Sequence, residues 1–156
     1  MQKIVTNLWF DTEAEEAAKF YISILGGKIT DVSHYGEAGP REAGMVLTVS
    51  FELGDGQIFT AINGGPEFPF TEAISLLVNC DSQEEIDTLW AKFTDGGEEV
   101  QCGWLKDRYG LSWQIVPRAI IGLLQGENPE GANRAMKAML GMKKIDIAAM
   151  QAAYDG

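Results

Sequence analysis

Two stretches of the chain place apolar residues three and four positions apart, the spacing that forms one face of an α-helix. Each stretch begins with a hydroxyl residue followed three positions later by glutamate, Thr12 with Glu15 and Ser82 with Glu85, a pattern typical of a capping box. Each ends in a Gly-Gly pair, and glycine readily takes the left-handed conformation that ends a helix. The apolar positions are Ala17, Phe20, Tyr21 and Ile24, then Ile86, Leu89, Trp90 and Phe93. The pattern predicts two helices of similar length.

These helices belong to an internal repeat, because Asp11 and Asp81 occupy matching positions at an offset of 81 − 11 = 70 residues. One extended apolar segment precedes each helix and three follow it, so each half predicts the order βαβββ. In the last segment, Leu111, Trp113 and Ile115 alternate with Ser112 and Gln114. We therefore expect an α+β fold. It would form one domain over 1–118, built from two modules at about 3–65 and 74–118, with a flexible loop at 36–44.

Beyond Pro117 the pattern changes to three short helical pieces, which predicts a helical C-terminal extension over 119–156. Asn128 and Pro129 are placed as N-cap and first helical residue of one piece, and Asp146 can start another. The apolar set of this extension is too large to leave in water. It comprises Met136, Met139, Leu140, Met142, Ile147 and Met150. We expect the extension to pack on its own domain or on a second subunit.

Composition narrows the class of protein. With 156 residues, 46% of them hydrophobic, the chain can bury a sizeable core. Its formal charge of −11 repels nucleic acid and anionic membrane surfaces, so neither is an expected partner. There is no apolar run of membrane-spanning length and the start lacks the order of a secretory signal, so we expect a cytoplasmic protein. The two cysteines, Cys80 and Cys102, are expected to be reduced thiols.

The doubled module, with "EEAAKFYISILGG" in its first half and "DRYGLSWQIVP" closing the second, resembles the vicinal oxygen chelate superfamily. That superfamily contains glyoxalase I, bleomycin resistance proteins and extradiol dioxygenases. Within it, the chain is most similar to the PhnB-like family, also called 3-demethylubiquinone-9 3-methyltransferase-like. The resemblance covers about residues 3–118. It implies the glyoxalase/bleomycin-resistance/dihydroxybiphenyl-dioxygenase type of fold, and it implies no particular reaction.

Enzymes of this superfamily hold a divalent metal with His and Glu side chains on the first and last strands of each module. The matching positions here are Val5 or Asn7, Ala61 or Asn63, Ser75, and Gln114, where related metal enzymes carry a glutamate. None of them is His, Glu or Asp. A neutral amide is a weak metal ligand, so the resemblance predicts a site without metal or other cofactor.

Polar side chains recur on the strand positions expected to face away from the helices. We predict that Asn7, Trp9, Asn63, Ser75 and Gln114 bind a small-molecule ligand in a cleft between or within the modules. Asn79 and Ser112 share this parity. The alternative is a structural network whose polar groups satisfy one another.

Other candidate residues have structural interpretations. The lone histidine, His34, is expected to be an ordinary surface or half-buried residue, and Cys80 is expected to be inert. Asp107 and Arg108 are expected to serve solvent exposure and turn formation.

Several functions fit this pattern. The first is a small-molecule binding protein or metal-independent enzyme of the PhnB-like group. The alternatives are a metal-dependent lyase or dioxygenase and a ligand-sequestering protein of the resistance type. The methyltransferase in the family name lacks support, because the chain has no Gly-rich loop of the kind that binds S-adenosylmethionine.

The chain is expected to form a homodimer. The apolar extension and the edges of two four-stranded sheets would expose surface that a single chain of 17.0 kDa covers poorly. Light scattering at micromolar concentration should report twice the chain mass, and a monomer mass would contradict the prediction.

Overall fold

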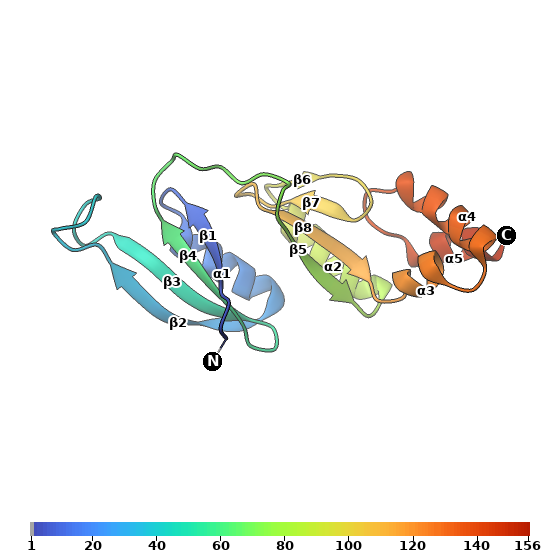
Figure 1. Ribbon diagram of the computed structural model, residues 1–156, viewed down its shortest axis with the longest axis horizontal. Coiled ribbons are helices and arrows are strands. Elements are labelled where there is room, and N and C mark those ends of the chain that lie inside the picture. The colour runs from blue at the N-terminus through green and yellow to red at the C-terminus, as the bar shows by residue number, and fades with distance from the viewer. Residues whose placement is uncertain (1) are drawn as a thin grey trace. The chain divides into compact units, whose positions relative to one another are not determined.

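The computed structural model describes residues 2–156, which form two compact units. The first ends at Pro69 and the second is Phe70–Gly156. Each unit contains a four-stranded mixed sheet with one helix packed on one face, and the second unit also carries three C-terminal helices (Figure 1). The α+β class and the two βαβββ modules are thereby confirmed.

The first unit contains β1 (Thr6–Phe10), α1 (Ala14–Leu25), β2 (Gly27–His34), β3 (Val46–Leu53) and β4 (Gln57–Asn63). Its strands are ordered β1-β4-β3-β2, with β1 parallel to β4 and the other neighbours antiparallel. The helix buries its apolar side on this sheet. The core includes Leu8, Ala17, Tyr21, Phe51 and Ala61.

The second unit repeats this arrangement with β5 (Ser75–Cys80), α2 (Gln83–Thr94), β6 (Glu98–Glu99), β7 (Trp104–Lys106) and β8 (Ser112–Pro117). The strand order is β5-β8-β7-β6, and β5 is parallel to β8. The position of each strand in the sheet therefore matches that of its counterpart in the first unit. The core beneath α2 includes Ile86, Phe93, Leu105, Trp113 and Ile115.

Only one of the two predicted hydroxyl caps is present. Ser82 is the N-cap of α2, and its side chain accepts a hydrogen bond from the Glu85 amide. The cap predicted at Thr12 is wrong, because α1 starts after Glu13 without a hydrogen bond from a local side chain. The amide of Ala14 instead donates to Oδ1 of Asn63, 2.8 Å away.

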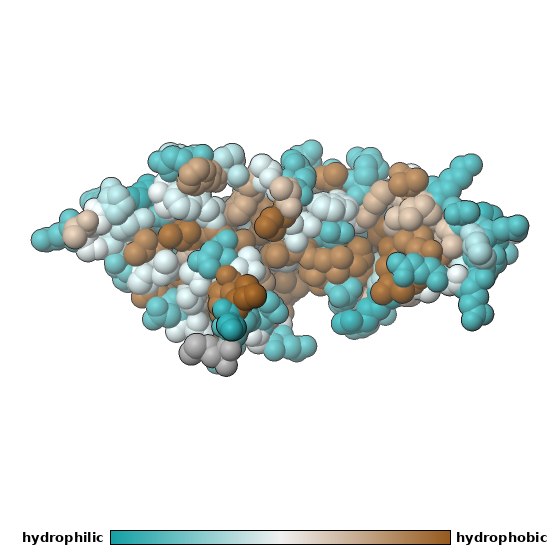
Figure 2. Space-filling view, viewed as in Figure 1, coloured by the Kyte–Doolittle hydropathy of each residue, from teal (hydrophilic) through white to brown (hydrophobic). Residues whose placement is uncertain are grey.

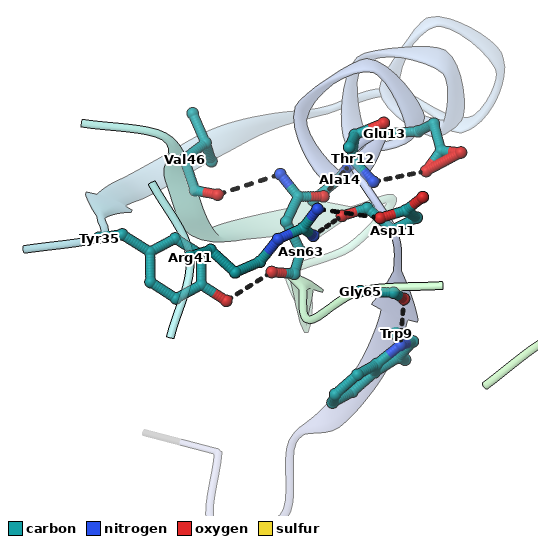
Figure 3. Close-up of polar contacts among 10 residues, drawn as sticks. All are labelled: Trp9, Asp11, Thr12, Glu13, Ala14, Tyr35, Arg41, Val46, Asn63 and Gly65. Atoms are coloured by element: carbon teal, nitrogen blue, oxygen red, sulfur yellow. Dashed lines mark hydrogen bonds and ion pairs between the residues drawn. The ribbon is translucent and has the colours of Figure 1, made fainter. Parts of the chain in front are cut away.

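Asn63 therefore has a structural position that differs from the predicted one. It was expected on the face turned away from the helix, but it lies under α1 with 2% of its surface exposed. Its Nδ2 donates to the Val46 carbonyl, and its own carbonyl accepts the Tyr35 hydroxyl at 2.6 Å (Figure 3). Asn63, the last residue of β4, therefore connects the first residue of α1 to the first residue of β3.

The segment at 36–44 is a loop, as predicted. Arg41 within it donates to the backbone carbonyl of Asp11 and pairs with the Asp11 carboxylate at 3.1 Å (Figure 3).

The C-terminal extension contains α3 (Ile120–Gln125), α4 (Pro129–Leu140) and α5 (Ile147–Asp155), grouped together in Figure 1. The predicted starts are confirmed, since Asn128 caps α4 ahead of Pro129 and Asp146 caps α5. A small core holds the three helices together. It consists of Leu123, Ala135, Ile145 and Met150. No helix within residues 2–156 is long and apolar enough to cross a bilayer.

The extension packs on the second unit of its own chain. Gln83 of α2 donates to the carbonyl of Ile145 at 2.9 Å and accepts from the amide of Ile147 at 2.8 Å. The amides of Cys102 and Gly103 donate to the carbonyls of residues 142 and 143. Of the two placements considered from the sequence, the structure shows packing on the same chain.

Asn63→Ala should lower the free energy of unfolding by about 2–4 kcal/mol, because it leaves the Ala14 amide and the Val46 carbonyl without their partner. Asn7→Ala is a matched control, since Asn7 is exposed and, within residues 2–156, its side chain bonds only the nearby Val5 carbonyl; it should cost less than about 0.5 kcal/mol. Urea unfolding of both variants measures the difference. Equal losses would contradict a structural role specific to Asn63.

Candidate functional site

Strand residues of the second unit alternate between the side covered by α2 and the opposite side. Leu105 and Trp113 are paired neighbours and are buried beneath the helix. The opposite side, here called the helix-free face, presents two rows of paired residues. They are Ser75, Ser112 and Lys106 in one row and Leu77, Gln114 and Trp104 in the next. In Figure 1 this face is turned toward the viewer, and in Figure 2 apolar side chains gather over these strands.

The structure brings two predicted site residues into contact on this face. Nε2 of Gln114 donates to Oγ of Ser75 at 2.9 Å. Among the described residues, Oε1 of Gln114 has no hydrogen-bond partner, and the hydroxyl hydrogen of Ser75 is not used in any other bond. The pair thus retains one acceptor and one donor for a further molecule.

Ser112 lies between Ser75 and Lys106 in the first row. The residue is 1% exposed, and its hydroxyl has no hydrogen-bond partner within the described part of the chain. A buried hydroxyl without a partner is costly, so this position has unused hydrogen-bonding capacity.

The turn that leads into β8 is held by a buried carboxylate. Solvent exposure was expected for Asp107, but only 3% of its surface is exposed. Its Oδ1 accepts the amides of Tyr109 and Leu111, and its Oδ2 accepts the indole N–H of Trp113 at 2.9 Å. The predicted turn chemistry is therefore confirmed. The predicted solvent exposure of Asp107 is wrong, because its carboxylate also binds a core tryptophan.

In the first unit, Asn7 and Trp9 alternate with the buried residues Leu8 and Phe10 and so lie on the side away from α1. The indole N–H of Trp9 donates to the Gly65 carbonyl at 2.8 Å (Figure 3), and its ring meets Phe68 edge-on with centroids 4.9 Å apart. The polar atom of Trp9 is thus engaged within the unit.

The residues at the metal-ligand positions do not fit a transition metal. The second unit offers a hydroxyl and an amide, Ser75 and Gln114, already bonded to each other. In the first unit, Asn63 uses both side-chain polar atoms to bind backbone. Within residues 2–156 there is no group of three or more His, Cys, Asp or Glu side chains that could hold a metal ion.

Two other candidates have settings that favour a structural role. The thiol of Cys80 is buried, and this burial, followed by the nearby Glu85 and Asp81, raises its pKa to about 12. It therefore stays protonated at neutral pH and is a poor nucleophile. His34 is exposed at the end of β2.

Comparison with known proteins identifies the class. The family model described as 3-demethylubiquinone-9 3-methyltransferase matches residues 2–116. A PhnB protein from Bacillus cereus is 40% identical, with a TM-score of 0.67, over 74% of this chain and 99% of its own. A protein from Pseudomonas aeruginosa is 23% identical with a TM-score of 0.62, over 75% of this chain and 98% of its own. A search of curated proteins found no match.

A further Bacillus cereus protein, described as a possible glyoxalase, is 14% identical with a TM-score of 0.50, over 73% of this chain and 98% of its own, and shows the fold alone. The chain thus has the glyoxalase/bleomycin-resistance/dioxygenase type of fold. It belongs to the 3-demethylubiquinone-9 3-methyltransferase-like, or PhnB-like, family. The family match ends before α3, so the helical extension lies outside it.

Sequence reasoning left the two other polar members of these rows out of the predicted site. Ser112 was assigned the right parity but was not included, and Lys106 was not considered. Lys106 and Ser112 are neighbours because β7 and β8 pair in this register. The register is not visible in the sequence, so their proximity could not be predicted from it.

Purified without an affinity tag, the protein should contain well under one zinc, nickel, manganese or iron ion per chain. The reason is that the mapped positions supply no carboxylate or imidazole. Elemental analysis by mass spectrometry measures this. One tightly held ion per chain would overturn the assignment of these positions.

Proposed function

We propose that the protein binds a small organic molecule on the helix-free face of its second unit, without a divalent metal. One observation carries the proposal: Gln114 and Ser75 bond to each other on this face and still retain an acceptor and a donor. Side chains that orient each other and keep free capacity are suited to position a ligand.

The surroundings of the pair indicate the character of the ligand. Leu77, next to Gln114 in the row, is 49% exposed, and Trp104 on its other side is half-buried. An apolar surround with a few polar atoms at its centre suits a mainly apolar molecule that carries an oxygen or nitrogen function.

The alternatives have less support. A metal-dependent lyase or dioxygenase would need ligands that the mapped positions lack. Methyl transfer from S-adenosylmethionine normally uses a glycine-rich turn after a first parallel strand, whereas the β1–α1 connection here reads Asp11-Thr12-Glu13. A ligand-sequestering protein of the resistance type remains a specific alternative, and it differs from an enzyme in returning its ligand unchanged.

A homodimer is part of this proposal. Its support is the apolar surface that the described residues leave exposed, including Ile74 at 65% and Leu140 at 61%.

The ligand can be sought directly. The purified protein is incubated with a metabolite extract, washed, and denatured, and the released compounds are identified by mass spectrometry. A compound recovered unchanged favours sequestration, and a converted compound favours an enzyme.

Gln114→Leu should weaken binding of the recovered compound by about five- to a hundredfold, because it removes hydrogen bonds worth roughly 1–3 kcal/mol. Folding should be nearly unaffected, since the amide is half-buried and its one partner, Ser75, can bond water. Calorimetry and thermal melts of the variant measure both effects. Gln57→Leu is the control, because that glutamine is exposed on the first unit and forms no side-chain hydrogen bond within residues 2–156.

The opposite pattern would contradict a ligand-binding role. A variant that melts several degrees lower when empty, yet binds the compound as tightly as the unmodified protein, would show that Gln114 only supports the fold.

A further inference from the structure

The first row of the helix-free face ends in a cation. Lys106 is the strand neighbour of Ser112, and paired residues of neighbouring strands project to the same side. Ser75, Ser112 and Lys106 therefore place two hydroxyls and an ammonium group in one line across three strands.

An ion pair crosses this line. Nζ of Lys106 contacts Oε1 of Glu72, which lies three positions before the first residue of β5. In the sheet, β8 lies between β5 and β7, so the bridge spans the start of β8 next to Ser112. Ser112 is 1% exposed although no helix covers this face, and the ion pair passes beside it.

The bridge is of the kind that opens readily. The side chains of Lys106 and Glu72 are 34% and 56% exposed, and exposed pairs contribute little to stability. The hydrogen bond between them lowers the pKa of Glu72 and raises that of Lys106, so both are charged at neutral pH. When the bridge opens, the ammonium group becomes available next to Ser112, its neighbour on β8.

We propose that Ser75, Ser112 and Lys106 form a subsite for a carboxylate group of the ligand. In the absence of ligand, the Glu72 carboxylate pairs with Lys106, and the ligand carboxylate replaces it on binding. The inference rests on the proposed function and adds the class of ligand, a small organic acid. The exchange leaves the number of negative charges beside Lys106 unchanged, because one carboxylate leaves as another arrives.

The other charge that faces this cation is Glu98, which pairs with Lys106 across β6 and β7. It favours the charged state of the lysine but also repels an incoming anion. Selection of a carboxylate therefore depends on the two serine hydroxyls as well as the ammonium group, since hydroxyls donate to anionic oxygen without adding charge.

The test uses the full chain, with benzoate as the probe and benzamide as its neutral counterpart. Titrations are followed by amide and side-chain NMR shifts at about 0.15 M salt, where exposed charges more than about 8 Å away are screened. Benzoate is expected to shift the signals of Ser75, Ser112 and Lys106 with saturation in the millimolar range typical of a fragment.

Two substitutions should act in opposite directions. Glu72→Gln removes the competing carboxylate and should tighten benzoate binding by about two- to fivefold, the range set by an exposed ion pair. Lys106→Gln should weaken it about tenfold or more through loss of a charge-assisted bond. Glu84→Gln is the matched control, since it removes one exposed carboxylate from the first turn of α2 and should change nothing.

Several outcomes would overturn the subsite. They are equal affinities for benzoate and benzamide, unchanged affinity in both variants, or benzoate shifts that map elsewhere or do not saturate at tens of millimolar. These results leave the proposed function standing if the compound from the extract still binds in a Gln114-dependent manner. If that compound does not bind on this face but benzoate behaves as expected, the proposed function fails separately.

Discussion

The buried carboxylate of Asp107 determines which way β8 presents its side chains. It binds two amides of the turn and the indole N–H of Trp113, so the tryptophan is fixed toward α2, where it also packs on Phe93. Because successive strand residues point to opposite sides, fixing Trp113 inward places Ser112 and Gln114 on the other face. A slip of one residue would exchange these sets. The chemistry of the helix-free face thus depends on a contact made on the opposite side of the sheet.

Local patterns were sufficient to predict the elements and their duplication. Helical spacing located α1 and α2, the repeat gave the βαβββ order twice, and Asn128 and Asp146 marked the starts of α4 and α5. Strict alternation in β8 also predicted the correct face for Gln114. Only one face of this strand is fully apolar, so that face packs on the core and Gln114 lies on the other. These signals involve residues close in sequence, and for this reason they can be recognised in the chain alone.

The errors arose where a distant residue decides the outcome. In β4, Ile58 and Ile62 alternate with Phe59 and Ala61, so both faces are apolar and periodicity does not show which side Asn63 takes. At the start of α1, where Thr12 was expected to be the cap, the asparagine satisfies the amide of Ala14, 49 positions away. Asp107 is an exception, because its third partner, Trp113, is only six positions away, but a turn pattern does not show that the carboxylate reaches a core indole. In the candidate site, alternation gave the faces, but only the register of β5, β7 and β8 brought Ser75, Ser112 and Lys106 into one row.

The extension that follows the family domain is attached mainly through backbone groups. The amides of Cys102 and Gly103 bond backbone carbonyls of the extension, and Gln83 bonds the carbonyl of Ile145 and the amide of Ile147. Backbone groups are present whatever the side chains are. Most substitutions in the attached segment would therefore preserve these bonds during evolution, whereas replacement of Gln83 would remove two of them at once. The hydrogen bonds of this junction therefore place a stronger selective constraint on Gln83 than on the side chains of the segment that it holds.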